Sequence, residues 1–435
     1  MTSPRTGPPV RNPPAQPAAD EGTGTRPTVV VAVHDGFYGC GTGAGMANRG
    51  LLSALADQLR PEVRLVILPV RLATTSVEYQ PDWHQQTLRI LHRADVHPVD
   101  NGSRGQTRYG GLDRFRKLVA GTARVLIAEI LPAARPCLVL AVDVPFLGLA
   151  PRLDDTTVRH LVLLPRATAR LHDPTNRQRI AWETQGLASA AARGARIACI
   201  STHMRDHLTE DYALPPRVLV DLPDGLHPDD HIPPAPHLRL PPDAAAGFLL
   251  AMGRAEPYKG FDDLLTALEH LTAAGTPVPH LLLAAVSDQA TPTDYQQHLA
   301  RRARTLPIPV TLLTRYQPGI RALLWHPGLR GVVIPSRAEP FGRVPLEAYA
   351  AGAAPVIATT AGGLTETVRD RLTGHTAPPA NPAALAAALA RALAMTEHDR
   401  QQMRITGKAL LADYQHPAAV ARFLVNTAPW AVTAR

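Results

Sequence analysis

Short runs of apolar residues alternate along this chain with longer stretches in which leucines and alanines recur every three or four positions. The runs are rich in Val, Ile and Leu without polar alternation, which is typical of strands buried on both faces of a parallel sheet. They lie at residues 28–33, 63–70, 137–142, 161–164, 195–200, 248–252, 280–285, 310–313, 331–334 and 355–358. Helical spacing between runs is clearest at Leu51, Leu52, Leu55 and Leu59. This alternation predicts βαβ units and an α/β fold.

A proline-rich run divides the pattern into two halves. Residues 228–242 hold six prolines, so no regular element fits there and a stiff connector between two domains is predicted. The first 26 residues also hold six prolines and little that is apolar, which is typical of a disordered tail. Further helices are expected at 262–271, 383–394 and 418–432. The predicted segments are a tail (1–26), an N-terminal Rossmann-like domain (27–227), a linker (228–246), a C-terminal Rossmann-like domain (247–415) and a C-terminal helix (416–435).

Composition and charge change this picture little. A net charge of +8 over 435 residues would suit nucleic acid, but only three residues are lysines and the arginines are scattered, so no nucleic-acid partner is expected. Residues 108–124 would suit an anionic membrane surface, although a solvated helix face is favoured. No segment reads as a membrane span or a signal peptide, which predicts a cytoplasmic protein. Cys40, Cys137 and Cys199 lie too far apart in sequence to support a disulfide framework or a structural zinc site.

The most informative segment covers residues 334–367. A strand ends at Ile334, a polar loop follows, and a helix is expected to begin near Pro345, because proline suits the first helical position. The unpaired N–H groups of that helix start predict an anion site. Glu339 and Glu347 bracket this site, so a diphosphate bound there would have a carboxylate near each end to accept hydroxyl hydrogen bonds.

The residues from Glu339 to Ala348, EPFGRVPLEA, resemble the glutamate–seven–glutamate signature of retaining GT-B glycosyltransferases, family 4 in particular. The segments 253–260 (GRAEPYKG), 223–226 (PDGL) and 362–366 (GGLTE) resemble further motifs of that family, in the family's order. The resemblance implies two Rossmann-like domains facing across a cleft. The first domain would bind the acceptor and the second the nucleotide sugar, with the C-terminal helix packing back on the first.

The resemblance also implies roles for matching residues. Arg254 and Lys259 would contact the diphosphate, where preorganised cations stabilise the charge that develops as the sugar departs. Glu339 would bind the donor sugar's hydroxyls and Glu347 the ribose hydroxyls. The implied catalytic residues are Arg254, Lys259 and Glu339. The implied donor-binding residues are Gly43, Gly45, Arg315, Tyr316, Phe341, Gly342, Arg343, Val344 and Glu347.

A glycine-rich loop at residues 39–45 supplies Gly43 and Gly45, and it has two interpretations. It resembles the family's N-terminal glycine loop, yet its spacing also fits a dinucleotide fingerprint. The strand that would carry an acidic ribose ligand ends in Arg71, which would suit only NADP.

One departure from the family lies after residues 161–164. Many members place a histidine there near the donor sugar, whereas this chain has Pro165 and Arg166, with His172 farther on. Arg166 and His172 are therefore the candidate donor-sugar contacts, His172 being better explained as an ordinary loop residue.

The expected activity is metal-independent, retaining transfer of a sugar from a UDP- or GDP-sugar to a small soluble metabolite or natural-product intermediate. No bound cofactor is expected, and neither a nucleophilic carboxylate nor a metal-binding Asp-x-Asp is evident. The acceptor would enter on the face that the nucleotide leaves, and a phosphate oxygen would take its proton. The alternatives are a GT-B sugar phosphorylase, an NADP-dependent oxidoreductase and a non-catalytic sugar-nucleotide-binding protein.

Overall fold

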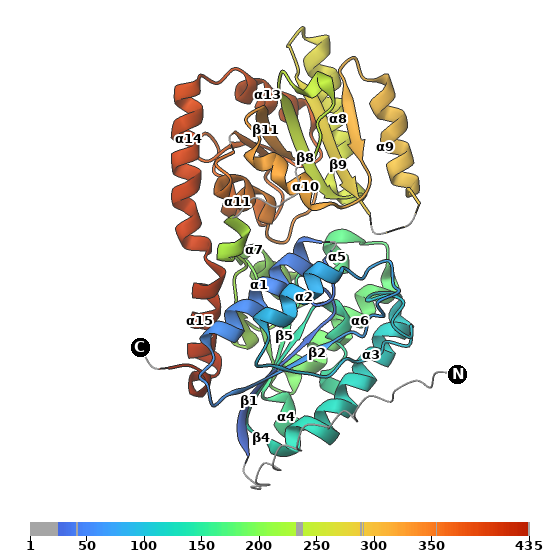
Figure 1. Ribbon diagram of the computed structural model, residues 1–435, viewed down its shortest axis with the longest axis vertical. Coiled ribbons are helices and arrows are strands. Elements are labelled where there is room, and N and C mark those ends of the chain that lie inside the picture. The colour runs from blue at the N-terminus through green and yellow to red at the C-terminus, as the bar shows by residue number, and fades with distance from the viewer. Residues whose placement is uncertain are drawn as a thin grey trace, which may run out of the picture.

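Two parallel sheets, each flanked by helices, lie one above the other along the long axis of the molecule (Figure 1). The computed structural model describes residues 25–40, 42–231, 238–287, 289, 291–353 and 355–433. The predicted tail therefore falls almost entirely outside the described residues, as does 232–237 of the predicted linker. The α/β fold with two Rossmann-like halves is confirmed.

The first sheet has seven strands in the order β3-β2-β1-β4-β5-β6-β7, and every pairing is parallel. Its strands are β1 (Arg26–Val33), β2 (Arg64–Pro69), β3 (Asp95–Val96), β4 (Ala134–Val142), β5 (Leu161–Leu164), β6 (Arg196–Cys199) and β7 (Leu219–Asp221). The five predicted strands are all present. Strands β3 and β7 escaped prediction because two or three residues carry no recognisable pattern.

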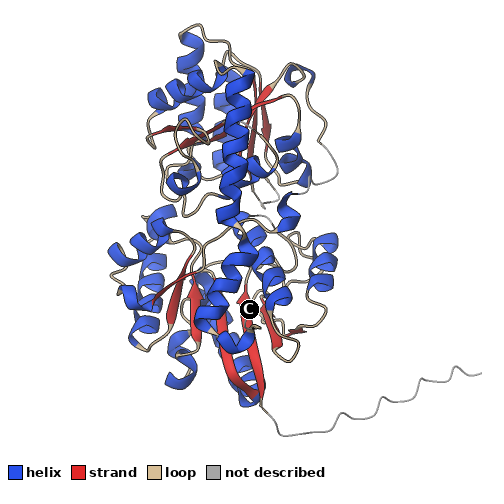
Figure 2. Cartoon of the chain, turned by 90° about the vertical axis from the view of Figure 1, so that its left-hand side faces the viewer, coloured by secondary structure: helices blue, strands red, loops and turns tan. Residues whose placement is uncertain are grey.

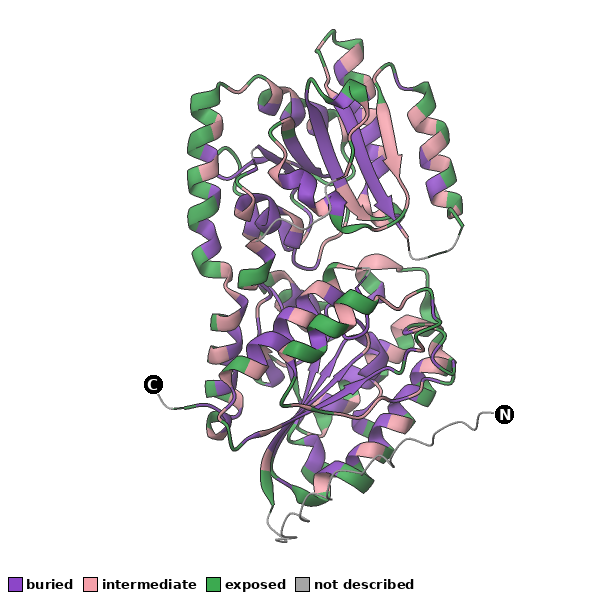
Figure 3. Cartoon of the chain, in the orientation of Figure 1, coloured by how far each residue is buried: buried purple, intermediate pink, exposed green. Residues whose placement is uncertain are grey.

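The second sheet has six parallel strands in the order β10-β9-β8-β11-β12-β13. Its strands are β8 (Phe248–Arg254), β9 (His280–Val286), β10 (Val310–Leu313), β11 (Leu329–Ile334), β12 (Val356–Thr359) and β13 (His375–Ala377). Only β13 was not predicted. The central strands of both sheets are buried, as the uninterrupted apolar runs require, whereas the edge strand β10 is half-buried and the outer faces of the helices are exposed (Figure 3).

Helices cover both sheets. Those of the first half are α1 (Gly43–Gln58), α2 (Pro81–Ile90), α3 (Leu112–Val125), α4 (Asp155–Val158), α5 (Ala169–His172), α6 (Arg177–Ala192) and α7 (Thr202–Glu210). Those of the second are α8 (Phe261–Ala273), α9 (Asp294–Thr305), α10 (Pro318–Ala322), α11 (Arg343–Ala350), α12 (Leu364–Thr367), α13 (Pro382–Leu393) and α14 (Glu397–Leu410), and the last helix, α15 (His416–Thr427), returns to the first half. Over the described ranges, none of these helices has both the length and the apolar character of a membrane span.

Two helix boundaries differ from the prediction. Helix α11 begins at Arg343 rather than near Pro345, because Gly342 adopts a φ of 96° and ends the preceding loop two residues earlier. The last helix runs over His416–Thr427 rather than 418–432, and a separate 3₁₀ turn follows at Pro429–Ala431.

The chain passes twice between the two halves, and the two passages are hydrogen-bonded to each other. Leu226 pairs with Gln415 in an isolated parallel bridge, in which the Leu226 N–H donates to the Tyr414 carbonyl at 2.9 Å and the His416 N–H to the Leu226 carbonyl at 3.0 Å. Helices α14 and α15 then run along one side of the molecule, from the second half back to the first (Figures 1 and 2). Helix α15 packs on α1, which confirms the predicted return of the C-terminal helix.

Candidate active site

The carboxyl ends of the two parallel sheets face each other. The Ser201 hydroxyl, just after β6, donates to the Pro340 carbonyl beyond β11 at 2.6 Å, and the His203 N–H donates to Glu366 at 2.9 Å. In the first sheet the strand order reverses between β1 and β4, and in the second between β8 and β11. Ligands of open α/β sheets bind in the crevice at such switch points. The predicted site residues lie around these two points.

Lys259 and Glu339 form a largely buried ion pair at the switch point of the second sheet. Lys259 ends the 3₁₀ turn Pro257–Lys259 beyond β8, and its Nζ lies 2.5 Å from Oε2 of Glu339. The Ser336 hydroxyl donates to the same oxygen at 3.2 Å. Gly260 follows with a φ of 67°, and a Cβ there would collide with the Pro335 carbonyl, so the turn is held close to the end of β11. This contact fixes the lysine beside the glutamate.

Next to this ion pair, His172 of the first half lies against Tyr258 of the second. The His172 ring, at the end of α5, stacks on the Tyr258 ring of the other half, with centroids 4.2 Å apart and planes 11° apart. Arg254 ends β8 and bonds the Tyr258 hydroxyl. Burial, followed by the charges of Arg254 and Lys259, lowers the pKa of His172 well below its usual value, so the ring is neutral at pH 7.

Arg343 and Glu347 belong to a buried network of four charges. Arg343 lies in the first turn of α11, and its Nε and Nη2 approach Oε1 of Glu347, each at 3.3 Å. Its Nη2 lies 2.9 Å from Asp230, and Arg321 lies near both Asp230 and Glu347, at 3.8 and 3.7 Å. Burial lowers the pKa of Arg343, but Asp230 and Glu347 raise it more, and the net shift is upward. Arg343 therefore stays charged.

The glycine loop of the first half approaches this network. Thr42 caps α1 by accepting from the Gly45 N–H at 3.1 Å, and a Cβ on Gly43 would lie 3.9 Å from Cδ of Arg343. The predicted residues Gly43 and Arg343, from different halves, are thus neighbours. A Cβ on Gly45 would lie only 2.7 Å from an oxygen of Asp35. Asp35 therefore occupies the space that a side chain at position 45 would need.

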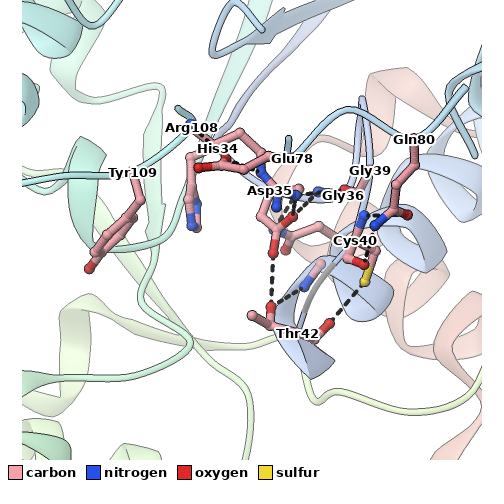
Figure 4. A network of polar contacts seen from close by, with 12 residues as sticks. His34, Asp35, Gly36, Gly39, Cys40, Thr42, Glu78, Gln80, Arg108 and Tyr109 are labelled. Carbon is pink, nitrogen blue, oxygen red and sulfur yellow. Dashed lines mark hydrogen bonds and ion pairs between the residues drawn. The ribbon is translucent and has the colours of Figure 1, made fainter. Parts of the chain in front are cut away.

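Asp35 is the centre of a second charged network (Figure 4). Its carboxylate accepts from the Thr42 hydroxyl at 2.8 Å and pairs with Arg108, whose Nε also lies 2.9 Å from Glu78. Burial raises the pKa of Glu78, but hydrogen bonds from Thr107 and Arg108 lower it more, so the carboxylate is ionised. This network fixes the loop next to the start of α1.

His34 and Asp143 lie at the switch point of the first sheet, at the ends of β1 and β4. His34 Nδ1 is 3.4 Å from Asp143, whose backbone has a φ of 79° and a ψ of 170°, a conformation that strains any residue other than glycine. Asn48 and the Arg166 N–H each donate to Asp143 at 3.3 Å. The Arg166 side chain bonds Asn48 at 2.5 Å and pairs with Asp224. Arg166 is 4% exposed, so its side chain is buried and joins Asn48 of α1 to Asp224.

The other predicted donor-binding residues occupy different positions. The Phe341 side chain is buried against Tyr414, which leaves only its backbone to contact a ligand. Val344 follows Arg343 in α11. Arg315 and Tyr316 lie in the loop after β10, and Tyr316 packs against the hydrophobic residues of β9 and α10.

The sequence interpretation missed four residues that the fold brings to the site: Asp230, Arg321, His34 and Asp143. Asp230 lies in the proline-rich run that was interpreted only as a linker. His34 and Asp143 directly follow apolar runs, and their position at the carboxyl ends of strands is the signal that could have found them.

The C-terminal half matches a known family. Residues 240–409 match the model described as glycosyl transferases group 1. A D-inositol 3-phosphate glycosyltransferase of Frankia alni is 30% identical over 260 residues, which cover 54% of this chain and 63% of the relative. A glycogen synthase of Mycobacterium tuberculosis is 33% identical over 168 residues, 38% of each chain. The chain thus spans about half the length of the curated relatives it matches.

Solved structures share the whole fold. Sucrose-phosphate synthase of Thermosynechococcus elongatus has a TM-score of 0.69 and 19% identity, covering 92% of this chain and 97% of that one. HepE of Anabaena in complex with UDP-glucose has a TM-score of 0.65 and 16% identity, covering 92% and 99%. The fold is therefore GT-B, and the resemblance to GT-B glycosyltransferases inferred from the sequence is confirmed.

Proposed function

We propose that this protein is a retaining glycosyltransferase that uses a nucleoside diphosphate sugar. The match to glycosyl transferases group 1 and the GT-B fold support this proposal. The observation that carries the proposal is a pair of carboxylates on either side of the α11 start, Glu339 partly buried and Glu347 buried, each held by a cation. Glu339 is held by Lys259 and Glu347 by Arg343. This arrangement supports a site for a diphosphate with hydroxyl-bearing groups at both ends.

The diphosphate would bind at the start of α11. The first N–H groups of a helix have no partner within the helix and attract anions. Gly342 precedes them in a left-handed conformation, and the position of its missing side chain faces Leu364, 2.7 Å away, so the glycine lets the loop pack closely against α12. The donor sugar would then contact Glu339 and the ribose would contact Glu347.

The protein's part in the reaction is orientation and charge stabilisation. The bond from the anomeric carbon to the β-phosphate oxygen breaks, and the acceptor hydroxyl forms the new bond on the same face. Its proton passes to the departing phosphate. Lys259 and Arg254 would stabilise the negative charge on that phosphate, and because they are already positioned they pay little reorganisation at the moment of reaction.

We propose a small soluble acceptor that binds at the carboxyl end of the first sheet, near His34, whose ring centroid lies 5.5 Å from that of Tyr109. The curated relatives named for inositol phosphate and the structural neighbour named for sucrose phosphate support a small polyol or sugar. The HepE complex with UDP-glucose supports a UDP-sugar as the first donor to test, with GDP-sugars next.

Thermal-shift binding tests the donor site. The melting temperature of the wild-type protein is measured with UDP, GDP, ADP, dTDP and NADPH. The same ligands are tested on Glu347→Ala and on a control, Glu269→Ala, which removes a carboxylate that pairs with Arg302. Stabilisation by one nucleoside diphosphate that is lost only in Glu347→Ala is expected. Stabilisation by NADPH alone would overturn the proposal.

A separate turnover assay distinguishes the sugar phosphorylase. Release of sugar 1-phosphate that depends on inorganic phosphate would indicate the phosphorylase instead of the glycosyltransferase.

A further inference from the structure

An arginine follows Gly342 in the signature segment, and its side chain is turned into the protein. Arg343 is 8% exposed and lies beneath Gly43 of the opposite half. Burial of a guanidinium is unfavourable unless nearly all of its donors are satisfied. The hydrogen-bond partners of the Arg343 guanidinium therefore indicate the role of this residue.

Those partners lie on two different parts of the chain. Nη1 of Arg343 donates to the Gly225 carbonyl at 2.8 Å, and Nη2 lies 2.9 Å from Asp230. Both partners belong to the first passage between the two halves. Nε and Nη2 reach Glu347 one helical turn along α11, at 3.3 Å. One planar group therefore connects the interdomain passage to the carboxylate proposed to bind ribose.

Glu347 has a cation beside each of its oxygens. Arg343 lies next to Oε1, while Nε of Arg321 lies 3.7 Å from Oε2. Arg321 is itself anchored, because its Nη2 donates to the Asp230 carbonyl. The two arginines and the carboxylates of Asp230 and Glu347 sum to zero charge. An ionised carboxylate has about four acceptor positions, so both oxygens keep capacity for ribose hydroxyls.

We propose that Arg343 is a positioning residue that holds Glu347 in its ribose-binding orientation by fastening it to the interdomain passage. This inference rests on the proposed function. Arg343 acts through Glu347 and does not bind the donor through its own side chain. Without Arg343, the cation left beside Glu347 is Arg321, which lies farther away. Asp230 also loses Arg343, which is closer to it than Arg321 is. The carboxylate then loses its fixed direction, and the energy of the ribose contact falls.

The test compares a nucleotide with its analogue lacking the ribose hydroxyls. Calorimetry measures the affinities of UDP and 2′,3′-dideoxy-UDP for wild type and Arg343→Leu, or of the corresponding GDP pair if the nucleotide panel selects guanine. Wild type should prefer the hydroxylated nucleotide by about tenfold or more, since each hydrogen bond to a charged group is worth about that ratio. In Arg343→Leu the preference should fall to about twofold, with the dideoxy affinity nearly unchanged.

Two further variants separate positioning from general damage. Arg302→Leu removes a guanidinium that bonds Asp262 and Glu269 away from the cleft, and it should keep the full preference. Arg343→Lys keeps the charge without the planar fork, so it should restore part of the preference. If Arg343→Leu is poorly folded, the lysine variant alone gives the measurement.

The outcomes distinguish this inference from the proposed function. Equal losses for both nucleotides in Arg343→Leu would show that Arg343 supports the diphosphate or the whole fold, and would overturn the inference alone. An unchanged preference would overturn it as well. Failure of the wild type to bind any nucleoside diphosphate would overturn the proposed function, and the inference with it.

Discussion

Most charged side chains of the candidate site are already paired within the protein. Lys259 is paired with Glu339, and Arg343 lies between Asp230 and Glu347. Charges removed from water require such partners, and replacing one member leaves the other buried and uncompensated. The same pairing fixes the orientation of each charged side chain, so each group is in place before a ligand binds. Substitutions here should therefore change ligand binding and rate as well as stability.

Lys259→Ala should lower kcat by about 10²–10³-fold, because a preorganised cation at the departing phosphate is lost. Nucleotide release at saturating donor measures the effect once the donor is known. Lys408, which is exposed on α14, gives the matched control: Lys408→Ala should keep wild-type kcat. A kcat of the Lys259→Ala variant within threefold of wild type would contradict the proposed role.

His416 should make the protein less stable in mild acid. Burial lowers its pKa to about 4, although Asp224 opposes the shift, and the unfolded value is about 6.5. Above pH 6.5 His416 is neutral in both the folded and the unfolded protein, so it adds no pH dependence to the free energy of unfolding. As the pH falls from 6.5 to 4 the unfolded state alone gains the proton, so the free energy of unfolding drops by up to about 3 kcal/mol.

Urea unfolding at pH 7 and pH 4.5 measures this dependence. His416→Asn, which cannot titrate, should lose less stability than wild type between the two values. Equal losses in the two proteins would show that other groups cause the acid sensitivity.

At the scale of the element, the 3₁₀ turn that carries Lys259 depends on one glycine. Gly260 and Gly275 have nearly the same positive φ, 67° and 71°, but only Gly260 lies against another segment. Gly275→Ala should cost about 1 kcal/mol from backbone strain alone. Gly260→Ala adds a collision with the Pro335 carbonyl, so it should cost more and also lower kcat by moving Lys259. Denaturation and turnover of the two variants, measured together, test this; equal stability and activity would contradict it.

The sequence predicted elements wherever one local pattern decides the structure. Ten apolar runs became strands because a strand buried on both faces needs no polar alternation. The start of α11 was placed two residues late because Pro345 suits a first helical position, whereas Gly342 actually ends the loop. The Asp230–Arg343 pair could not be predicted, since it joins residues more than a hundred positions apart through the crossing of the chain.

At the scale of the whole molecule, the last helix belongs to the core of the first half. Phe423 of α15 is 1% exposed, so Phe423→Ala should reduce the free energy of unfolding by about 3–5 kcal/mol. Val425, two residues on, is 56% exposed, and Val425→Ala should change it by less than about 0.5 kcal/mol. Denaturant unfolding of both variants checks this; similar small losses would mean that α15 is not a core element.

The bond between the two interdomain passages also limits how the molecule moves. Because an isolated bridge joins Leu226 to Gln415, any sliding of the two halves past each other would break its two hydrogen bonds. We expect bending about that bridge to be the main motion of one half relative to the other. The separations of Gly43 from Arg343 and of His172 from Tyr258 should then rise and fall together. A single pair of fluorophores, one on each half, is therefore enough to follow the opening of the cleft.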